Sequence, residues 1–269
     1  MNVSLIALPA ALLYLAGGFS TGLRLFAART DRRPPRALGI GLGFAGLVLH
    51  TLVLLDGLVI DAGLNLSFFH AMSLSAWLIA LLLLVAAVRR PVENLGILLL
   101  PLAGLSVLLA ARYPAVRLLA PDTPFGLKLH VMVSLLAYSL LTLAAVQAVL
   151  LALQDAKLRR HHPGGFVRAL PPLQTMESLL FEMISIGFAL LSLALLSGFL
   201  FLEDMFAQHL VHKTVLSIAS WVVFGVLLWG RYRFGWRGRL AIRWTLSGFA
   251  VLMLAYFGSK AALELILTR

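Results

Sequence analysis

Long runs of apolar residues, separated by short polar segments, repeat along the whole chain. Eight of these runs have roughly the 17 to 25 residues that a helix needs to cross the hydrocarbon core of a bilayer. They cover residues 3–24, 37–58, 66–88, 94–112, 126–154, 174–201, 211–230 and 241–266. The fifth run is longer than one crossing requires, so its helix is expected to tilt or to extend into the aqueous phase. The pattern predicts an all-α membrane helix bundle with about eight transmembrane helices.

The composition agrees with a single integral membrane domain over residues 1–269. The chain is 61% hydrophobic and 12% charged, whereas soluble domains are about half apolar and about a quarter charged. No low-complexity segment or repeat divides the chain. The longest polar connection, from about residue 155 to 175, is too short to form a folded domain.

The distribution of basic residues predicts the orientation in the membrane. Of the 22 Lys and Arg residues, 16 follow the first, third, fifth and seventh runs, and 6 lie on the opposite side. Because cytoplasmic connections are rich in Lys and Arg, both termini are predicted to lie outside, in the periplasm. The net charge of +11 is therefore interpreted as a topology feature. No nucleic-acid partner is expected, because the basic residues are scattered through short connections.

Five of the seven histidines fall near run ends that this topology places outside. They are His50, His70, His130, His209 and His212. Imidazole is the commonest protein ligand for haem iron and binds several transition metals. Two cations on the same side, Lys128 and Lys213, would suit the propionate groups of a haem. We therefore predict a cofactor site for haem b near the outer membrane face, with His130 and His212 as the candidate iron ligands.

Each of these histidines has an alternative interpretation, as a hydrogen-bonded residue near a helix end that binds no metal. A divalent metal site is also geometrically possible at the short hairpin between His50 and His70, which contains Asp56 and Asp61. No fixed spacing of ligands supports that site. Five histidines on one side strengthen the case for haem contact by at least one of them, and the interpretation as residues that bind no metal stays open.

Four other ionisable residues are interpreted as structural. Glu177 is interpreted as an acidic residue that complements a helix N-terminus, and the deeper Glu182 as an ion-pair partner of an inner arginine. His161 and His162 are expected in a solvated basic turn. The chain has no cysteine, which excludes disulfide exchange and covalent haem attachment through its own thiols. No catalytic arrangement is visible, so no enzyme is predicted.

Short motifs in the last two thirds of the chain occur in a recognisable order. His130 leads into Ser-Leu-Leu-Ala-Tyr. The later motifs are Gly-Phe-Ala-Leu-Leu (187–191), Ser-Gly (197–198), His-Lys-Thr-Val-Leu-Ser (212–217), Gly-Trp-Arg-Gly-Arg (235–239), Gly-Phe (248–249) and Ala-Tyr-Phe-Gly (255–258). In this order and spacing the chain resembles the cytochrome c assembly membrane proteins, the CcsA, CcmC and HemX superfamily. Within it the chain is most similar to the short, eight-span YpjD-like branch. The resemblance covers about residues 66–266.

The resemblance implies that the protein handles haem at the outer membrane face. In better-studied relatives a histidine opens the helix equivalent to the fifth run, which matches His130. A tryptophan-rich segment with a Trp-Trp-Asp signature covers the haem in those relatives. The corresponding residues here, between Gly198 and Thr214, contain no tryptophan, so an accessory role is favoured over a complete synthase. The family's second histidine has no direct counterpart, and His209 and His212 are our own candidates for that position.

Together these features predict a multi-pass protein of the bacterial cytoplasmic (inner) membrane. Its predicted function is haem binding or transfer, accessory to cytochrome c biogenesis or haem homeostasis, with other maturation or membrane proteins as partners. The predicted mechanism is non-catalytic: histidines bind the iron while helices surround the porphyrin. One alternative is a scaffold or regulatory membrane protein that binds no haem. Another is a transporter of small solutes or metals that uses Glu182 and the histidines.

Overall fold

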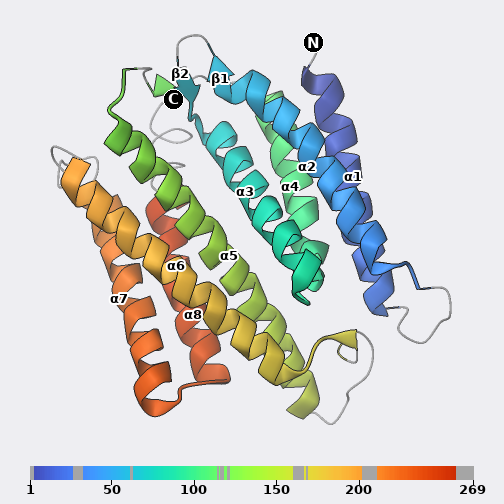
Figure 1. The fold of residues 1–269 in the computed structure, drawn as a ribbon, viewed down its shortest axis with the longest axis vertical. Helices are drawn as coiled ribbons and strands as arrows, with labels where there is room; N and C mark the ends of the chain where they lie inside the picture. The colour runs from blue at the N-terminus through green and yellow to red at the C-terminus, as the bar shows by residue number, and fades with distance from the viewer. Residues whose placement is uncertain are drawn as a thin grey trace. The chain divides into compact units, whose positions relative to one another are not determined.

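The computed structural model describes residues 3–26, 33–60, 63–113, 115, 118–119, 122–159, 167, 169–201 and 211–258. Almost all regular structure in these residues is helical (Figure 1). The helices are α1 (Val3–Phe26), α2 (Arg36–Leu58), α3 (Phe68–Arg89), α4 (Gly96–Arg112), α5 (Phe125–Arg159), α6 (Leu173–Phe201), α7 (Val211–Phe234) and α8 (Arg239–Met253). A 3-10 turn, η1 (Glu93–Leu95), precedes α4, and a π-helical turn, η3 (Leu254–Gly258), continues α8.

Eight helices in the described part of the chain are long and apolar enough to cross a membrane. The predicted all-α membrane bundle is therefore confirmed, while the outward placement of both termini stays a prediction. The helix α5 has 35 residues, which at 1.5 Å per residue gives a length of about 52 Å. This length exceeds the roughly 30 Å of the hydrocarbon core, so α5 cannot lie wholly within it along the membrane normal.

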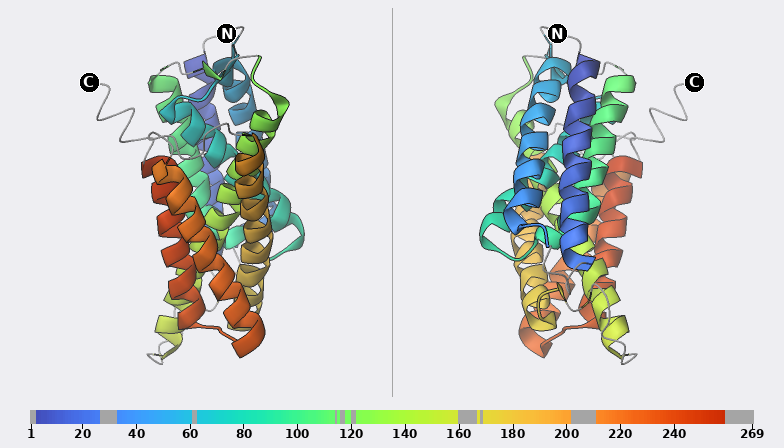
Figure 2. Two further views of the ribbon diagram at one scale, coloured as in Figure 1. Left: turned by 90° about the vertical axis from the view of Figure 1, so that its left-hand side faces the viewer. Right: turned by 90° about the vertical axis from the view of Figure 1, so that its right-hand side faces the viewer.

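The helices form two compact units, each of which packs four helices around its own core. Unit 1 consists of residues 1–122 and 162–171, and unit 2 of residues 123–161 and 172–269. In unit 1, α1 and α3 each pack against α2 and α4. In unit 2, α5 and α7 each pack against α6 and α8, as the two side views of Figure 2 allow the reader to follow. The prediction of a single membrane domain stays a prediction.

A small antiparallel sheet, which the sequence did not predict, joins two connections of unit 1. Its strands are β1 (Val59–Ile60), β2 (Gly63–Asn65) and β3 (Leu118–Leu119), in the order β1-β2-β3. The buried side chain of Asn65 strengthens this junction. Its Nδ2 donates to the backbone oxygens of Gly57 at 3.4 Å and Ala115 at 2.9 Å. The start of α3 is thereby tied to the end of α2 and to the segment after α4.

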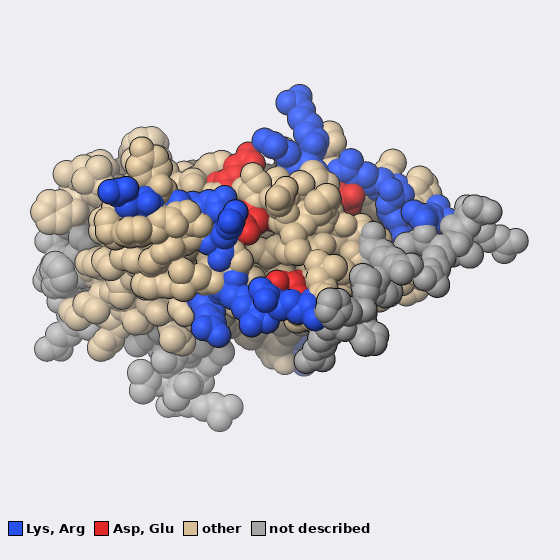
Figure 3. All heavy atoms as spheres, turned by 90° about the horizontal axis from the view of Figure 1, so that it is seen from below, with Lys and Arg blue, Asp and Glu red and all other residues tan. Residues whose placement is uncertain are grey.

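Charged side chains gather at the helix ends that are predicted to lie inside. Figure 3 shows Lys and Arg spread over these ends, with a few acidic residues among them. In unit 1, Nη2 of Arg36 donates to the backbone oxygens of Ala87 at 2.6 Å and Arg90 at 2.7 Å, and it pairs with Glu93 at 3.1 Å. Carbonyl groups at the end of a helix lack partners within the helix. The Arg36 guanidinium therefore caps the C-terminus of α3.

Candidate functional site

Unit 2 contains a cavity of about 330 Å³ that is lined by all four of its helices. The α5 wall presents His130, Ser134 and Tyr138, whose four-residue spacing places them on one face of the helix. The other lining residues are Val131, Leu191, Ala194, Leu195, Lys213, Thr214, Ser217, Leu252, Ala255 and Tyr256. Mostly apolar walls with a few polar groups are typical of a site for a small molecule or cofactor.

His130 is half-buried and is held on one side by α6. Its Nδ1 lies 3.0 Å from the backbone oxygen of Ala194 and 3.1 Å from Oγ of Ser197. A carbonyl oxygen can only accept a hydrogen bond, so in the neutral ring Nδ1 carries the hydrogen and Nε2 keeps its lone pair. No other described residue hydrogen-bonds to this ring. Metal-ligating histidines are commonly anchored in this way through the nitrogen that does not bind the metal.

Aromatic rings cluster around Tyr138, one of the residues that line the cavity. Tyr138 lies two turns along α5 from His130, and its ring centroid is 5.3 Å from that of Tyr256, 5.4 Å from that of Phe257 and 5.9 Å from that of Phe249. Tyr256 and Phe257 are consecutive residues of η3. π-Helical turns are frequent at functional sites. Tyr138 and Tyr256 belong to the Ser-Leu-Leu-Ala-Tyr and Ala-Tyr-Phe-Gly motifs, but nothing in the sequence pattern indicated that they line a site.

The structure brings together some of the predicted site residues and separates others. Lys213 lines the same cavity as His130, whereas the side chain of its neighbour His212 is exposed. His212 is not part of the cavity lining, although it directly precedes Lys213 in α7. Lys128 is half-buried near the start of α5 and is not part of the cavity lining. His209 lies outside the described residues, as do His161 and His162.

His50 belongs to unit 1 and has the arrangement of a structural histidine. Its side chain is fully buried. Its Nδ1 lies 3.3 Å from the hydroxyl of Tyr14 on α1, and its Nε2 lies 2.8 Å from Oγ of Ser73 on α3. Both ring nitrogens are occupied, so the imidazole links α1, α2 and α3 and presents no lone pair to a metal.

His70, also in unit 1, takes part in fixing the start of α3. Its Nδ1 lies 2.9 Å from Oγ of Ser67, the N-cap residue, whose N–H donates to Oδ1 of Asn65 at 3.2 Å. Its Nε2 is so close to Gly57 that a Cβ at that position would lie 2.9 Å away. Among the described residues no group of three or more His, Asp and Glu side chains is arranged to hold a metal ion. Asp61 lies outside them.

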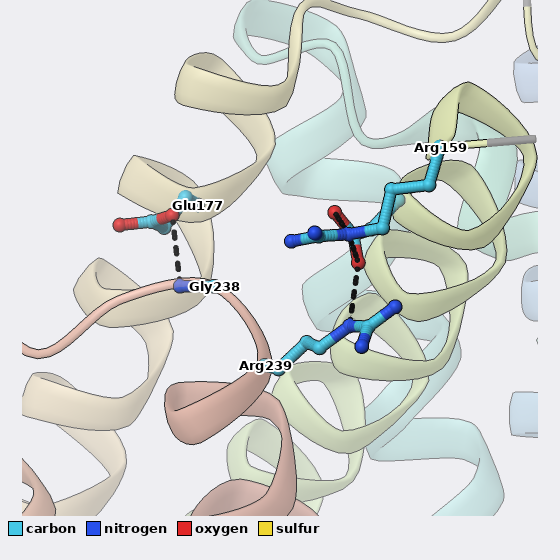
Figure 4. Close-up of polar contacts among 5 residues, drawn as sticks. Arg159, Glu177, Gly238 and Arg239 are labelled. Carbon is cyan, nitrogen blue, oxygen red and sulfur yellow. Dashed lines mark hydrogen bonds and ion pairs between the residues drawn. The ribbon is translucent and has the colours of Figure 1, made fainter. Parts of the chain in front are cut away.

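At the opposite end of unit 2 from His130, Glu177 joins α6 to the connection between α7 and α8 (Figure 4). Its Oε1 accepts from Nη1 of Arg231 at 2.9 Å, and its Oε2 accepts from the N–H of Gly238 at 3.3 Å. The expected role of Glu177 at a helix N-terminus is wrong. The helix α6 begins at Leu173 and has no acidic residue in its first turn, so Glu177 lies one turn further along, within reach of α7.

Asp155 makes the second polar link at this end of unit 2. Its Oδ2 pairs with Nε of Arg159 at 3.0 Å within α5, and with Nε of Arg239 on α8 at 3.1 Å (Figure 4). Together with Glu177, this carboxylate holds the four helices at the end remote from the cavity. Glu182 has an exposed side chain and does not line the cavity, and its predicted ion pair with an arginine stays a prediction.

The described part of the chain defines an integral membrane protein with eight helices long enough to cross a membrane and a cavity lined by His130 in unit 2. The chain belongs to the cytochrome C assembly protein family, which it matches over residues 39–267. It is 35% identical over 231 residues to the inner membrane protein YpjD of Escherichia coli K12, across 84% of this chain and 85% of that protein. The family and the YpjD-like branch inferred from the sequence motifs are thus confirmed.

Two further relatives extend this comparison. An uncharacterized 28.8 kDa protein of Azospirillum brasilense is 34% identical over 192 residues, across 70% of this chain and 71% of that protein. The cytochrome c biogenesis protein CcsA of Guillardia theta is 26% identical over 149 residues, across 49% of this chain and 50% of that protein. No solved structure gives a significant match. Membership of the family connects the chain with cytochrome c biogenesis.

Proposed function

We propose that the chain is a haem-binding protein of the bacterial inner membrane, and that the cavity of unit 2 is its haem site. One observation carries this proposal: His130 lines an apolar cavity while its Nδ1 is held by the backbone oxygen of Ala194. This arrangement leaves the Nε2 lone pair for iron, and haem proteins commonly bind iron through such an imidazole. The apolar walls suit the macrocycle.

The remaining polar groups fit the edge of a haem. Lys213 lines the cavity, and its ammonium group would pair with a propionate. His130 would hold the iron of a bound haem, and haem proteins use one or two such side chains. The exposed His212, with His209, stays our candidate for the second ligand. A cavity of about 330 Å³ is at the lower end of the range for small-molecule sites, so a porphyrin bound there would be only partly enclosed.

Within this proposal the protein is accessory to cytochrome c biogenesis or haem homeostasis. The family membership supports a place in cytochrome c assembly. The lack of tryptophan between Gly198 and Thr214 supports an accessory role, since the better-studied members of the superfamily cover haem with a tryptophan-rich segment there. We infer no catalytic step: the protein would bind haem, orient it and release it to a membrane or maturation partner.

The absorption spectrum of the detergent-purified protein tests this function, in oxidised and reduced forms and before and after addition of haem. We expect a Soret band that His130→Ala abolishes or shifts. Met132→Ala is the matched control, because this α5 side chain is 63% exposed and does not line the cavity. A wild-type protein that takes up no haem, or a His130→Ala protein with an unchanged spectrum and affinity, would overturn the proposal.

The two alternatives make different predictions in the same experiments. A scaffold protein would take up no haem, and His130→Ala would leave its absorption spectrum unchanged. A transporter that uses Glu182 would need this carboxylate on a path with the histidines. The Glu182 side chain is exposed and lies outside the cavity lining, so we favour haem binding over transport.

A further inference from the structure

Ser197 lies next to the proposed iron ligand but outside the cavity lining. Its hydroxyl donates to the backbone oxygen of Ala194 at 2.9 Å, and its Oγ is 3.1 Å from Nδ1 of His130. A serine hydroxyl has a single hydrogen to donate. Because that hydrogen is used on Ala194, Ser197 acts toward His130 only as an acceptor.

The Nδ1–H group of His130 is therefore shared between two acceptors on α6. The oxygens lie at 3.0 Å and 3.1 Å, both within ordinary hydrogen-bond range. A flip of the ring would replace Nδ1 with a carbon atom and lose both contacts. The pair of oxygens thus restrains the rotation of the ring as well as its tautomer.

The contact between His130 and α6 lies between two places where α5 and α6 pack closely. One turn before His130, a Cβ at Gly126 would collide with the ring of Phe201, which lies one turn after Ser197. Further along the same two helices, a Cβ at Gly187 would lie 2.7 Å from Cδ2 of Leu141. At both places a side chain of one helix lies directly against a glycine of the other, so α5 and α6 are closely packed on either side of His130.

We propose that Ser197 is a positioning residue for His130. By accepting the Nδ1 hydrogen beside the Ala194 carbonyl, it keeps Nε2 unprotonated and directs it away from α6, as an iron ligand requires. The iron-binding consequence rests on the proposed function, whereas the effect on the tautomer does not require haem. Groups that orient a ligating histidine typically change metal affinity by about 10- to 100-fold when they are removed.

The first test uses the haem-free protein, labelled with ¹⁵N at its histidines. The signals of His130 are assigned by comparison with His130→Gln, and their shifts report which ring nitrogen carries the hydrogen. We expect the Nδ1–H form in the wild type. Loss of one neutral hydrogen bond in Ser197→Ala should increase the Nε2–H fraction about fivefold. Ser197→Thr keeps the hydroxyl and should restore the wild-type shifts.

Ser192→Ala is the matched control on the same helix. The hydroxyl of Ser192 also donates to a backbone oxygen of α6, that of Phe188 at 2.8 Å, and it accepts from Nε1 of Trp221 at 2.8 Å. The substitution Ser192→Ala therefore removes an equivalent hydroxyl that makes no contact with His130. Wild-type shifts of His130 in Ser197→Ala, or an equal change in Ser192→Ala, would overturn the positioning role.

The second test is titration of the same variants with haem. We expect Ser197→Ala to raise the haem dissociation constant about tenfold, with Ser197→Thr and Ser192→Ala near the wild type. A wild type without haem affinity, combined with a tautomer shift in Ser197→Ala, refutes the haem site but supports the positioning role. Haem binding that depends on His130 but is unaffected by Ser197→Ala refutes the proposed role in iron binding alone.

Discussion

Replacing His50 with alanine should destabilise the protein by about 3 kcal/mol and leave its haem affinity unchanged. The His50 side chain is fully buried, so its removal leaves a cavity that costs about 2 kcal/mol or more. The hydroxyls of Tyr14 and Ser73 would also lose a partner. Interhelical hydrogen bonds within membranes contribute on average about 0.6 kcal/mol each, which brings the sum to about 3 kcal/mol.

Two serines of α3 provide a matched pair for the hydrogen-bond part of this estimate. Both are buried, but Ser73 contacts His50 of α2 at 2.8 Å, whereas Ser75 donates to the Ala71 backbone oxygen of its own helix at 2.8 Å. We expect Ser73→Ala to cost about 1 kcal/mol. Ser75→Ala should cost under about 0.5 kcal/mol, because no contact between helices is lost.

The assay is reversible unfolding in mixed micelles, followed by circular dichroism, together with haem titration of the same preparations. A His50→Ala protein that is as stable as Ser75→Ala but has lost haem affinity would refute this reasoning. That result would mean that His50 binds iron, although its two ring nitrogens contact Tyr14 and Ser73. Equal losses in both serine variants would refute the interhelical link.

Three further predictions concern unit 2. Glu177→Gln should lower stability to thermal unfolding by up to about 1 kcal/mol, because its half-exposed pair with Arg231 is weak, and added salt should reduce the difference. Lys213→Met should raise the haem dissociation constant about two- to fivefold at low ionic strength. If the salt dependence of that constant is the same in the variant and the wild type, Lys213 does not contact the haem. Gly187→Val should cost about 1 to 3 kcal/mol in unfolding experiments, because a Cβ there meets Leu141; a variant of wild-type stability would contradict the close contact of α5 with α6.

The eight helices could be predicted because a membrane imposes a simple rule on the sequence. Each span needs about 20 apolar residues, and polar residues such as Arg36 and Arg89 mark where the apolar runs begin and end. Local features that depend on tertiary contacts were not predicted. The small sheet is one case, since it joins residues 59–60 and 63–65 to the distant residues 118–119, and the π-helical turn η3 is another.

For the candidate site, the sequence identified His130 but not its environment. The Ala194 carbonyl and Ser197 hydroxyl come from another helix, and their contact depends on how α5 packs on α6. The sequence also placed His212 and Lys213 together, because both lie at one end of α7. Which of the two faces the cavity depends on the rotation of that helix, and a shift of one residue changes the direction by about 100°.

The length of α5 has a consequence for where the cavity lies in the bilayer. About 38 Å of helix axis separates His130 from Asp155 at 1.5 Å per residue. Even at a typical tilt of about 20°, this separation exceeds a hydrocarbon core of about 30 Å. When the carboxylate of Asp155 stays hydrated at one boundary of the hydrocarbon core, the imidazole of His130 is therefore held at the opposite boundary. Bilayer thickness therefore sets the depth of the cavity mouth, and lipids with longer or shorter acyl chains should alter how readily an amphiphilic molecule enters it.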